Sequence, residues 1–140
     1  MAVAESVTAG QLQFFFSTLP HAEEFFQGGI TVYNLGQKTR QLNIDPIHAK
    51  SCNSVSEKIA TDMASNVAKK FVSDWGIGIT GYASPVPELD IQLLYAYYAI
   101  VYKGQPMELS CINSIKASPS EVQRDYAEFI IERFAELILV

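Results

Sequence analysis

The 140-residue chain lacks most of the features that assign a compartment or a membrane at once. It has two cysteines, Cys52 and Cys111, which lie far apart and match no metal-binding, redox or disulfide-framework spacing. No apolar run approaches the roughly 18 residues that a transmembrane helix needs. The first residues, MAVAES, have neither the basic start nor the apolar core of a secretory signal. We therefore expect a cytoplasmic protein with no membrane partner.

Positive charge and cofactor motifs are also scarce. Ten Lys and Arg residues face fifteen Asp and Glu residues, giving a formal net charge of −5, and no basic run is present. Binding to nucleic acid phosphates needs clustered cations, so nucleic acid is an unexpected partner. The sequence has no Walker A loop, no G-x-G-x-x-G turn and no metal-ligand spacing, so it predicts no cofactor and no metal.

What the chain does contain is typical of one globular domain. Hydrophobic residues make up 49% and charged residues only 18% of the sequence. The apolar fraction excludes intrinsic disorder, and no linker-like segment divides the chain, so we expect a single domain over residues 1–140. Because few charges remain to solvate the surface, we expect a second subunit to cover some apolar surface.

The hydrophobic pattern alternates between strands and helices. It predicts strands near 2–5, 30–33, 75–80, 93–102 and 107–113. It predicts a helix over 12–19 and a short one near 38–42 that stops near Pro46. A third helix is predicted from a capping box at Ser54 and Glu57 to Phe71. The last begins at Pro119, with Ser118 as its cap. Such alternation indicates an α/β layered domain with a mostly parallel sheet and one antiparallel hairpin.

The turn after the first strand is the first candidate for chemistry. It reads Ser6-Val7-Thr8-Ala9-Gly10 and leads into a helix. A hydroxyl at such a turn is a candidate nucleophile, and neighbouring N–H groups can stabilise an oxyanion. The structural alternative is that Ser6 or Thr8 merely caps the helix, since serine and threonine are preferred caps.

A nucleophile needs a base, and the sequence offers few. His21 and His48 are the only histidines, and both lie in polar segments typical of the surface. Lys38 follows the second strand, at the edge where α/β sheets bind ligands, and would serve if its pKa were depressed. Thr80 and Gly81 end another parallel strand at that same edge. The predicted topology therefore brings these polar groups to one crevice.

Four segments together resemble a known family. They match, in order and spacing, the patterns A-E-S-C-T-G-G at 4–10, G-G-V-V-x-Y-S-N-E-A-K at 28–38, H-G-A-V-S-E-x-V-A-x-x-M-A at 52–64 and I-[ST]-G-I-A-G-P-G-G at 79–87. These patterns are those of the CinA C-terminal domain family, which includes nicotinamide mononucleotide deamidases. The resemblance covers nearly the whole chain and implies a three-layer α/β/α sandwich, a homodimer and hydrolysis of a nucleotide carboxamide.

The resemblance also implies roles for individual residues. Ser6 corresponds to the nucleophile, Lys38 to its general base, and Tyr33 and Thr80 to residues beside that pair. The residues that would bind substrate are Thr8, Gly10, Asn34, Gly81 and Lys116. The last of these is the cation nearest to the place where the family has an arginine before its final helix.

Three departures favour the alternative that the domain is a non-catalytic binding or assembly module. Ala9 stands where the family has glycine, which would block a close backbone approach or force another turn. The glycine-rich loop after the Thr80 strand has become Ser84-Pro85-Val86-Pro87-Glu88. The family's arginine falls near Pro119. Retention of the Ser6, Tyr33, Lys38 and Thr80 positions favours the enzyme.

Overall fold

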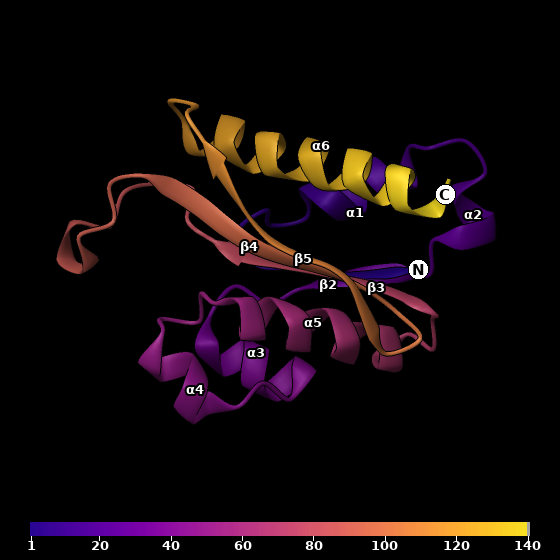
Figure 1. Cartoon of the computed structure of the whole chain (residues 1–140), viewed down its shortest axis with the longest axis horizontal. Coiled ribbons are helices and arrows are strands. Elements are labelled where there is room, and N and C mark those ends of the chain that lie inside the picture. The colour runs from indigo at the N-terminus through magenta and orange to yellow at the C-terminus, as the bar shows by residue number, and fades with distance from the viewer. Residues whose placement is uncertain (140) are drawn as a thin grey trace.

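A five-stranded sheet forms the middle layer of the molecule, a computed structural model that describes residues 1–139 (Figure 1). Its strands are β1 (Ala2–Glu5), β2 (Gly28–Thr31), β3 (Trp75–Gly81), β4 (Leu94–Tyr102) and β5 (Gln105–Ser114). They are ordered β2-β1-β3-β4-β5, and β1 pairs in parallel with both β2 and β3. Only β4 runs in the opposite direction, antiparallel to β3 and β5. The expected mixed sheet with an antiparallel hairpin is confirmed.

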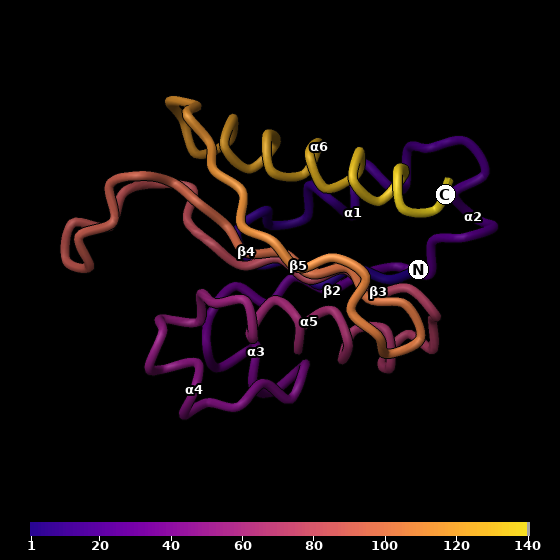
Figure 2. Tube along the Cα trace, viewed as in Figure 1, coloured from indigo at the N-terminus to yellow at the C-terminus, as the bar shows by residue number. Residues whose placement is uncertain are grey.

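Helices cover both faces of this sheet (Figure 1). Helices α1 (Gln11–Ser17) and α6 (Pro119–Ile138) cover one face, and α3 (Leu35–Leu42), α4 (Pro46–Ser51) and α5 (Glu57–Lys70) lie on the other. The short α2 (Ala22–Phe25) leads into β2. The connection from β3 to β4 holds the 3₁₀ turn η1 (Pro87–Leu89) and projects away from the layers (Figure 2). The three-layer α/β/α sandwich is thus confirmed.

Two glycines let α5 lie unusually close to the sheet. A Cβ at Gly76 would come within 2.1 Å of the Ala64 carbonyl oxygen, and one at Gly78 within 2.4 Å of the Ala60 carbonyl oxygen. The two alanines are fully buried at this contact. Close packing of small residues fixes α5, and the loop before it, against β3.

Some predicted boundaries are wrong because local capping is supplied by other residues. The N-cap of α5 is Ser56, whose Oγ accepts a hydrogen bond from the Ile59 N–H at 3.1 Å, and not Ser54. Pro46 begins α4 instead of ending a helix, with Asp45 as its cap. The second strand starts two residues earlier than predicted, at Gly28. The start of α6 is as predicted, with Ser118 as cap and Pro119 in the first turn.

The cap of α1 also differs from the expectation. Neither Ser6 nor Thr8 caps this helix; instead the buried carboxylate of Glu5 accepts the N–H groups of Leu12 at 2.8 Å and Gln13 at 2.9 Å. The same carboxylate accepts the Thr8 hydroxyl at 2.6 Å. Its negative charge already complements the helix dipole. Because Glu5 supplies these acceptors, the Ser6 hydroxyl is not needed to cap α1.

Ala9, which stands where the family pattern has glycine, adopts a strained backbone conformation. Ala9 has φ +48° and Gly10 φ +103°, so the turn keeps two consecutive left-handed residues. This conformation costs a non-glycine residue about 1–2 kcal/mol.

Ala9→Gly should therefore raise the free energy of unfolding by about 0.5–1 kcal/mol, because the strain released exceeds the entropy that glycine loses. Urea unfolding would measure it. The reciprocal control is Gly10→Ala, where a Cβ meets nothing within 4 Å; backbone strain alone should destabilise this variant by about 1 kcal/mol. A destabilised Ala9→Gly protein would contradict the strain argument.

Candidate active site

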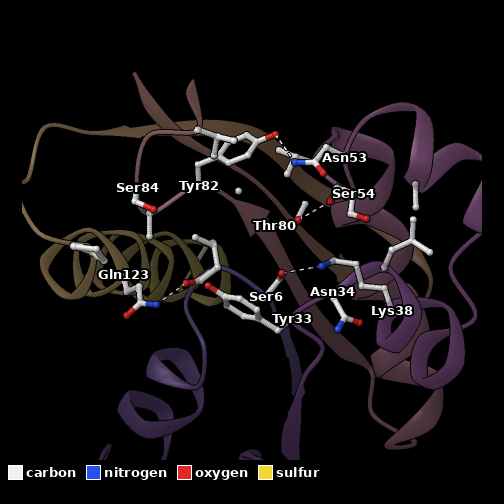
Figure 3. Close-up of a pocket in the computed structure, with 18 of the residues that line it drawn as sticks. Ser6, Tyr33, Asn34, Lys38, Asn53, Ser54, Thr80, Tyr82, Ser84 and Gln123 are labelled. Carbon is white, nitrogen blue, oxygen red and sulfur yellow. Dashed lines mark hydrogen bonds between the residues drawn. The ribbon is translucent and has the colours of Figure 1, made fainter. Parts of the chain in front are cut away.

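A cavity of about 490 Å³ opens at the carboxyl ends of β1, β2 and β3 (Figure 3). Its walls include Ser6, Tyr33, Asn34, Lys38, Thr80 and Gly81. The volume lies in the range of small-molecule sites. The predicted convergence of three strand ends is therefore observed, and six of the nine predicted site residues line one cavity.

Ser6 and Lys38 make the central contact of this cavity. The Lys38 Nζ donates a hydrogen bond to Ser6 Oγ at 2.8 Å and a second one to the Val32 carbonyl oxygen at 3.2 Å. Lys38 is 2% exposed and Ser6 is 6% exposed. The Asn34 side chain caps α3 by accepting the Gln37 N–H at 2.9 Å, which places Lys38 one turn into the helix, facing the sheet.

Burial changes the acid–base chemistry of this lysine. It lowers the pKa of Lys38 from 10.5 to about 8, because the ammonium loses water and no carboxylate among residues 1–139 compensates for it. A substantial neutral fraction therefore exists at pH 8. A neutral amine in hydrogen-bond contact with a hydroxyl has the geometry of a general base beside a nucleophile.

Thr80 and Tyr33 lie beside the pair in different environments. Thr80 is fully buried and donates its hydroxyl to the Ser54 carbonyl oxygen at 2.7 Å. This bond ties the end of β3 to the loop before α5. Tyr33 is 66% exposed and lines the same cavity, so its ring is available to a bound molecule (Figure 3).

Three predicted substrate-binding residues do not line the cavity. The Thr8 hydroxyl is directed to Glu5, and Gly10 is the N-cap position of α1. Lys116 is exposed in the connection between β5 and α6. Thr8 and Gly10 lie outside the cavity because the turn from Ser6 folds its later residues towards α1, and Lys116 lies outside it in the connection that leads to α6.

The histidines also lie outside the walls of the cavity. His48 Nε2 lies 3.1 Å from the Ser56 Oγ, and His21 is exposed. Among residues 1–139, one group of side chains is close enough to share an ion, the exposed His21, Glu23 and Glu24 near α2, and none of the three lines the cavity.

Sequence reasoning missed six polar residues that line the cavity: Lys50, Asn53, Ser54, Tyr82, Ser84 and Gln123. Asn53 donates its side-chain N–H to the Tyr82 hydroxyl at 3.3 Å, linking two loops above Thr80 (Figure 3). Gln123 reaches from α6 to the Val7 carbonyl oxygen at 3.0 Å. Asn53 occupies a glycine position of the third pattern and has φ +53°. Asparagine in place of glycine is a sequence signal for a left-handed turn at this position. Gln123 carries no local signal, because only the tertiary fold brings α6 to β1.

Fold and site together define a three-layer α/β domain with a buried serine–lysine pair at the carboxyl edge of its sheet. The family model of the CinA C-terminal domain matches residues 1–138, and the chain belongs to that family.

Relatives and solved structures agree with this membership. CinA-like proteins of Synechocystis sp. and Trichodesmium erythraeum are each 40% identical over 85 residues, which cover 61% of this chain and 20% of theirs. The matched segment thus spans about a fifth of the length of these curated relatives. A CinA superfamily protein from Escherichia coli superposes with a TM-score of 0.84 at 22% identity, covering 97% of this chain and 78% of that one. One from Klebsiella pneumoniae gives 0.85 at 20% identity, covering 99% and 87%. These likenesses show the shared fold.

Within residues 1–139, no helix has the length and apolar character required to cross a bilayer.

Proposed function

We propose that this domain is an amidohydrolase that converts nicotinamide mononucleotide and water to nicotinate mononucleotide and ammonia. The observation that carries the proposal is the 2.8 Å hydrogen bond between Lys38 Nζ and Ser6 Oγ inside a cavity of about 490 Å³. Amide hydrolysis requires a nucleophile, a proton carrier and oxyanion donors. The substrate comes from the family resemblance, and the chemistry comes from the residues.

In the first half of the reaction, neutral Lys38 accepts the Ser6 proton while Ser6 Oγ attacks the carboxamide carbon. Val7 follows the nucleophile and lines the cavity, and its backbone N–H makes no hydrogen bond within the described part of the chain, so it is suited to the oxyanion. The C–N bond then breaks, and the lysine delivers its proton to the departing nitrogen, which leaves as ammonia. An ester between Ser6 and the nicotinoyl group remains.

In the second half, Lys38 is again neutral and accepts a proton from water, whose oxygen attacks the ester carbon. The ester C–O bond breaks, and the proton returns to Ser6 Oγ. The products are a carboxylic acid, which ionises in water, and the regenerated enzyme. Because Lys38 takes and returns one proton in each half, the protons balance over the whole cycle.

The experiment is an ammonia-release assay with the purified protein and nicotinamide mononucleotide. Ammonia and nicotinate mononucleotide should appear in equal amounts. Absence of turnover by a folded protein would overturn the proposal and leave the binding or assembly module as the function of the domain.

A further inference from the structure

The charges that line the cavity have one sign only. Lys38 and Lys50 line it, and no aspartate or glutamate does among the described residues. This is unexpected in a chain with fifteen acidic and ten basic residues. Clefts lined by one sign of charge concentrate ligands of the opposite sign, even when the net charge of the protein repels them.

The two lysines differ in what they offer a ligand. Lys38 is buried, and its amine is engaged with Ser6 and the Val32 carbonyl oxygen. Lys50 is exposed on α4 and makes no ion pair within residues 1–139. Lys50 is therefore the charge that remains free for a ligand.

The same wall carries neutral hydrogen-bonding groups. Asn53 and Ser54 follow Lys50 closely in the chain and also line the cavity. The Asn53 amide uses one N–H for the Tyr82 hydroxyl, which leaves its second N–H for another acceptor. One cation beside neutral donors suits an anion with several oxygens.

We propose that Lys50 is the cation of an anion subsite that holds the phosphate monoester of the substrate. This proposal rests on the proposed function for the identity of the phosphorylated amide. Binding of a phosphate at Lys50 does not itself depend on whether the amide is hydrolysed. It places the charge on α4, whereas the sequence pointed to Lys116, which lies outside the cavity. The site then selects phosphorylated amides over the same amides without a phosphate through one side chain.

The first test measures binding of inorganic phosphate to the wild-type protein, Lys50→Ala and Lys69→Ala by calorimetry at low salt. Lys69 is an exposed lysine of α5 outside the cavity, so its variant matches the change in net charge. Lys50→Ala should weaken phosphate binding about tenfold, and Lys69→Ala should leave it unchanged. Equal binding by all three proteins, or no binding by the wild type, would overturn the subsite.

The second test compares nicotinamide mononucleotide with nicotinamide riboside, which carries the same pyridinium ring and amide but lacks the phosphate. Lys50→Ala should raise KM for the phosphorylated amide about tenfold with kcat retained, and should leave kinetics with the riboside unchanged. An equal effect on both substrates would assign Lys50 a structural role and contradict the subsite. If neither substrate is hydrolysed, the proposed function fails, while the phosphate titration still decides the subsite.

Discussion

Ser6→Ala is expected to reduce ammonia release from nicotinamide mononucleotide by about a thousand-fold or more. Without the Oγ no ester can form, and loss of a nucleophile has effects of this size in other serine hydrolases. The free energy of unfolding should change by only about 1 kcal/mol, since one hydrogen bond to Lys38 is lost. Steady-state ammonia assays and urea unfolding would measure the two effects.

A matched control is Ser110→Ala, which removes an exposed hydroxyl on β5 outside the cavity. This variant should keep wild-type activity. Substantial activity in Ser6→Ala would contradict the assignment of Ser6 as nucleophile, whatever the effect on stability.

Lys38→Met is expected to abolish turnover while preserving or raising stability. Methionine fills a similar apolar volume but carries no proton acceptor, so activity should fall by at least about a thousand-fold. The buried ammonium has no carboxylate partner in the described part of the chain, so its removal relieves a desolvation cost. At pH 7 the free energy of unfolding should stay constant or rise by up to about 2 kcal/mol, after the lost hydrogen bonds are offset.

The pH dependence of stability separates this effect from general repacking. The pKa of Lys38 is about 8 in the folded protein and 10.5 when exposed, so the unfolded chain binds the extra proton between these values. The cost of burying the charge is fully present below pH 8 and disappears as the pH rises towards 10.5. Wild-type stability should therefore rise relative to Lys38→Met over this interval. Lys69→Met, at an exposed position, should follow the wild-type dependence of stability on pH. If the curve of Lys38→Met also runs parallel to that of the wild type, the depressed pKa of Lys38 is contradicted.

The elements of the fold follow from local signals where those signals are strong. Ser118 and Pro119 mark the start of α6, and the apolar stripe behind them predicts its buried face. The predicted helix boundaries are wrong where several residues that can cap a helix lie within a few positions of one another. Ser54 and Ser56 both precede Glu57, and the choice of Ser56 follows from the left-handed backbone at Ser54, where φ is +60°.

The site was predictable to the extent that strand ends determine it. Ser6, Lys38 and Thr80 meet because β1, β2 and β3 are parallel and adjacent. Lys50 and Gln123 were not predictable, because helices on opposite faces of the sheet bring them to the cavity. Glu5 shows a second limit: a buried carboxylate took the capping role that short polar residues usually fill. The expected dimer and cytoplasmic location stay predictions.

The pH profile of kcat/KM for ammonia release from nicotinamide mononucleotide tests the central claim most directly. If neutral Lys38 is the base for Ser6, the rate should rise with pH as the lysine loses its proton, with an apparent pKa of about 8 and a plateau above it. A profile that is flat from about pH 6.5 to 9.5, or one that rises near the ordinary histidine value of about 6.5, would contradict the serine–lysine mechanism.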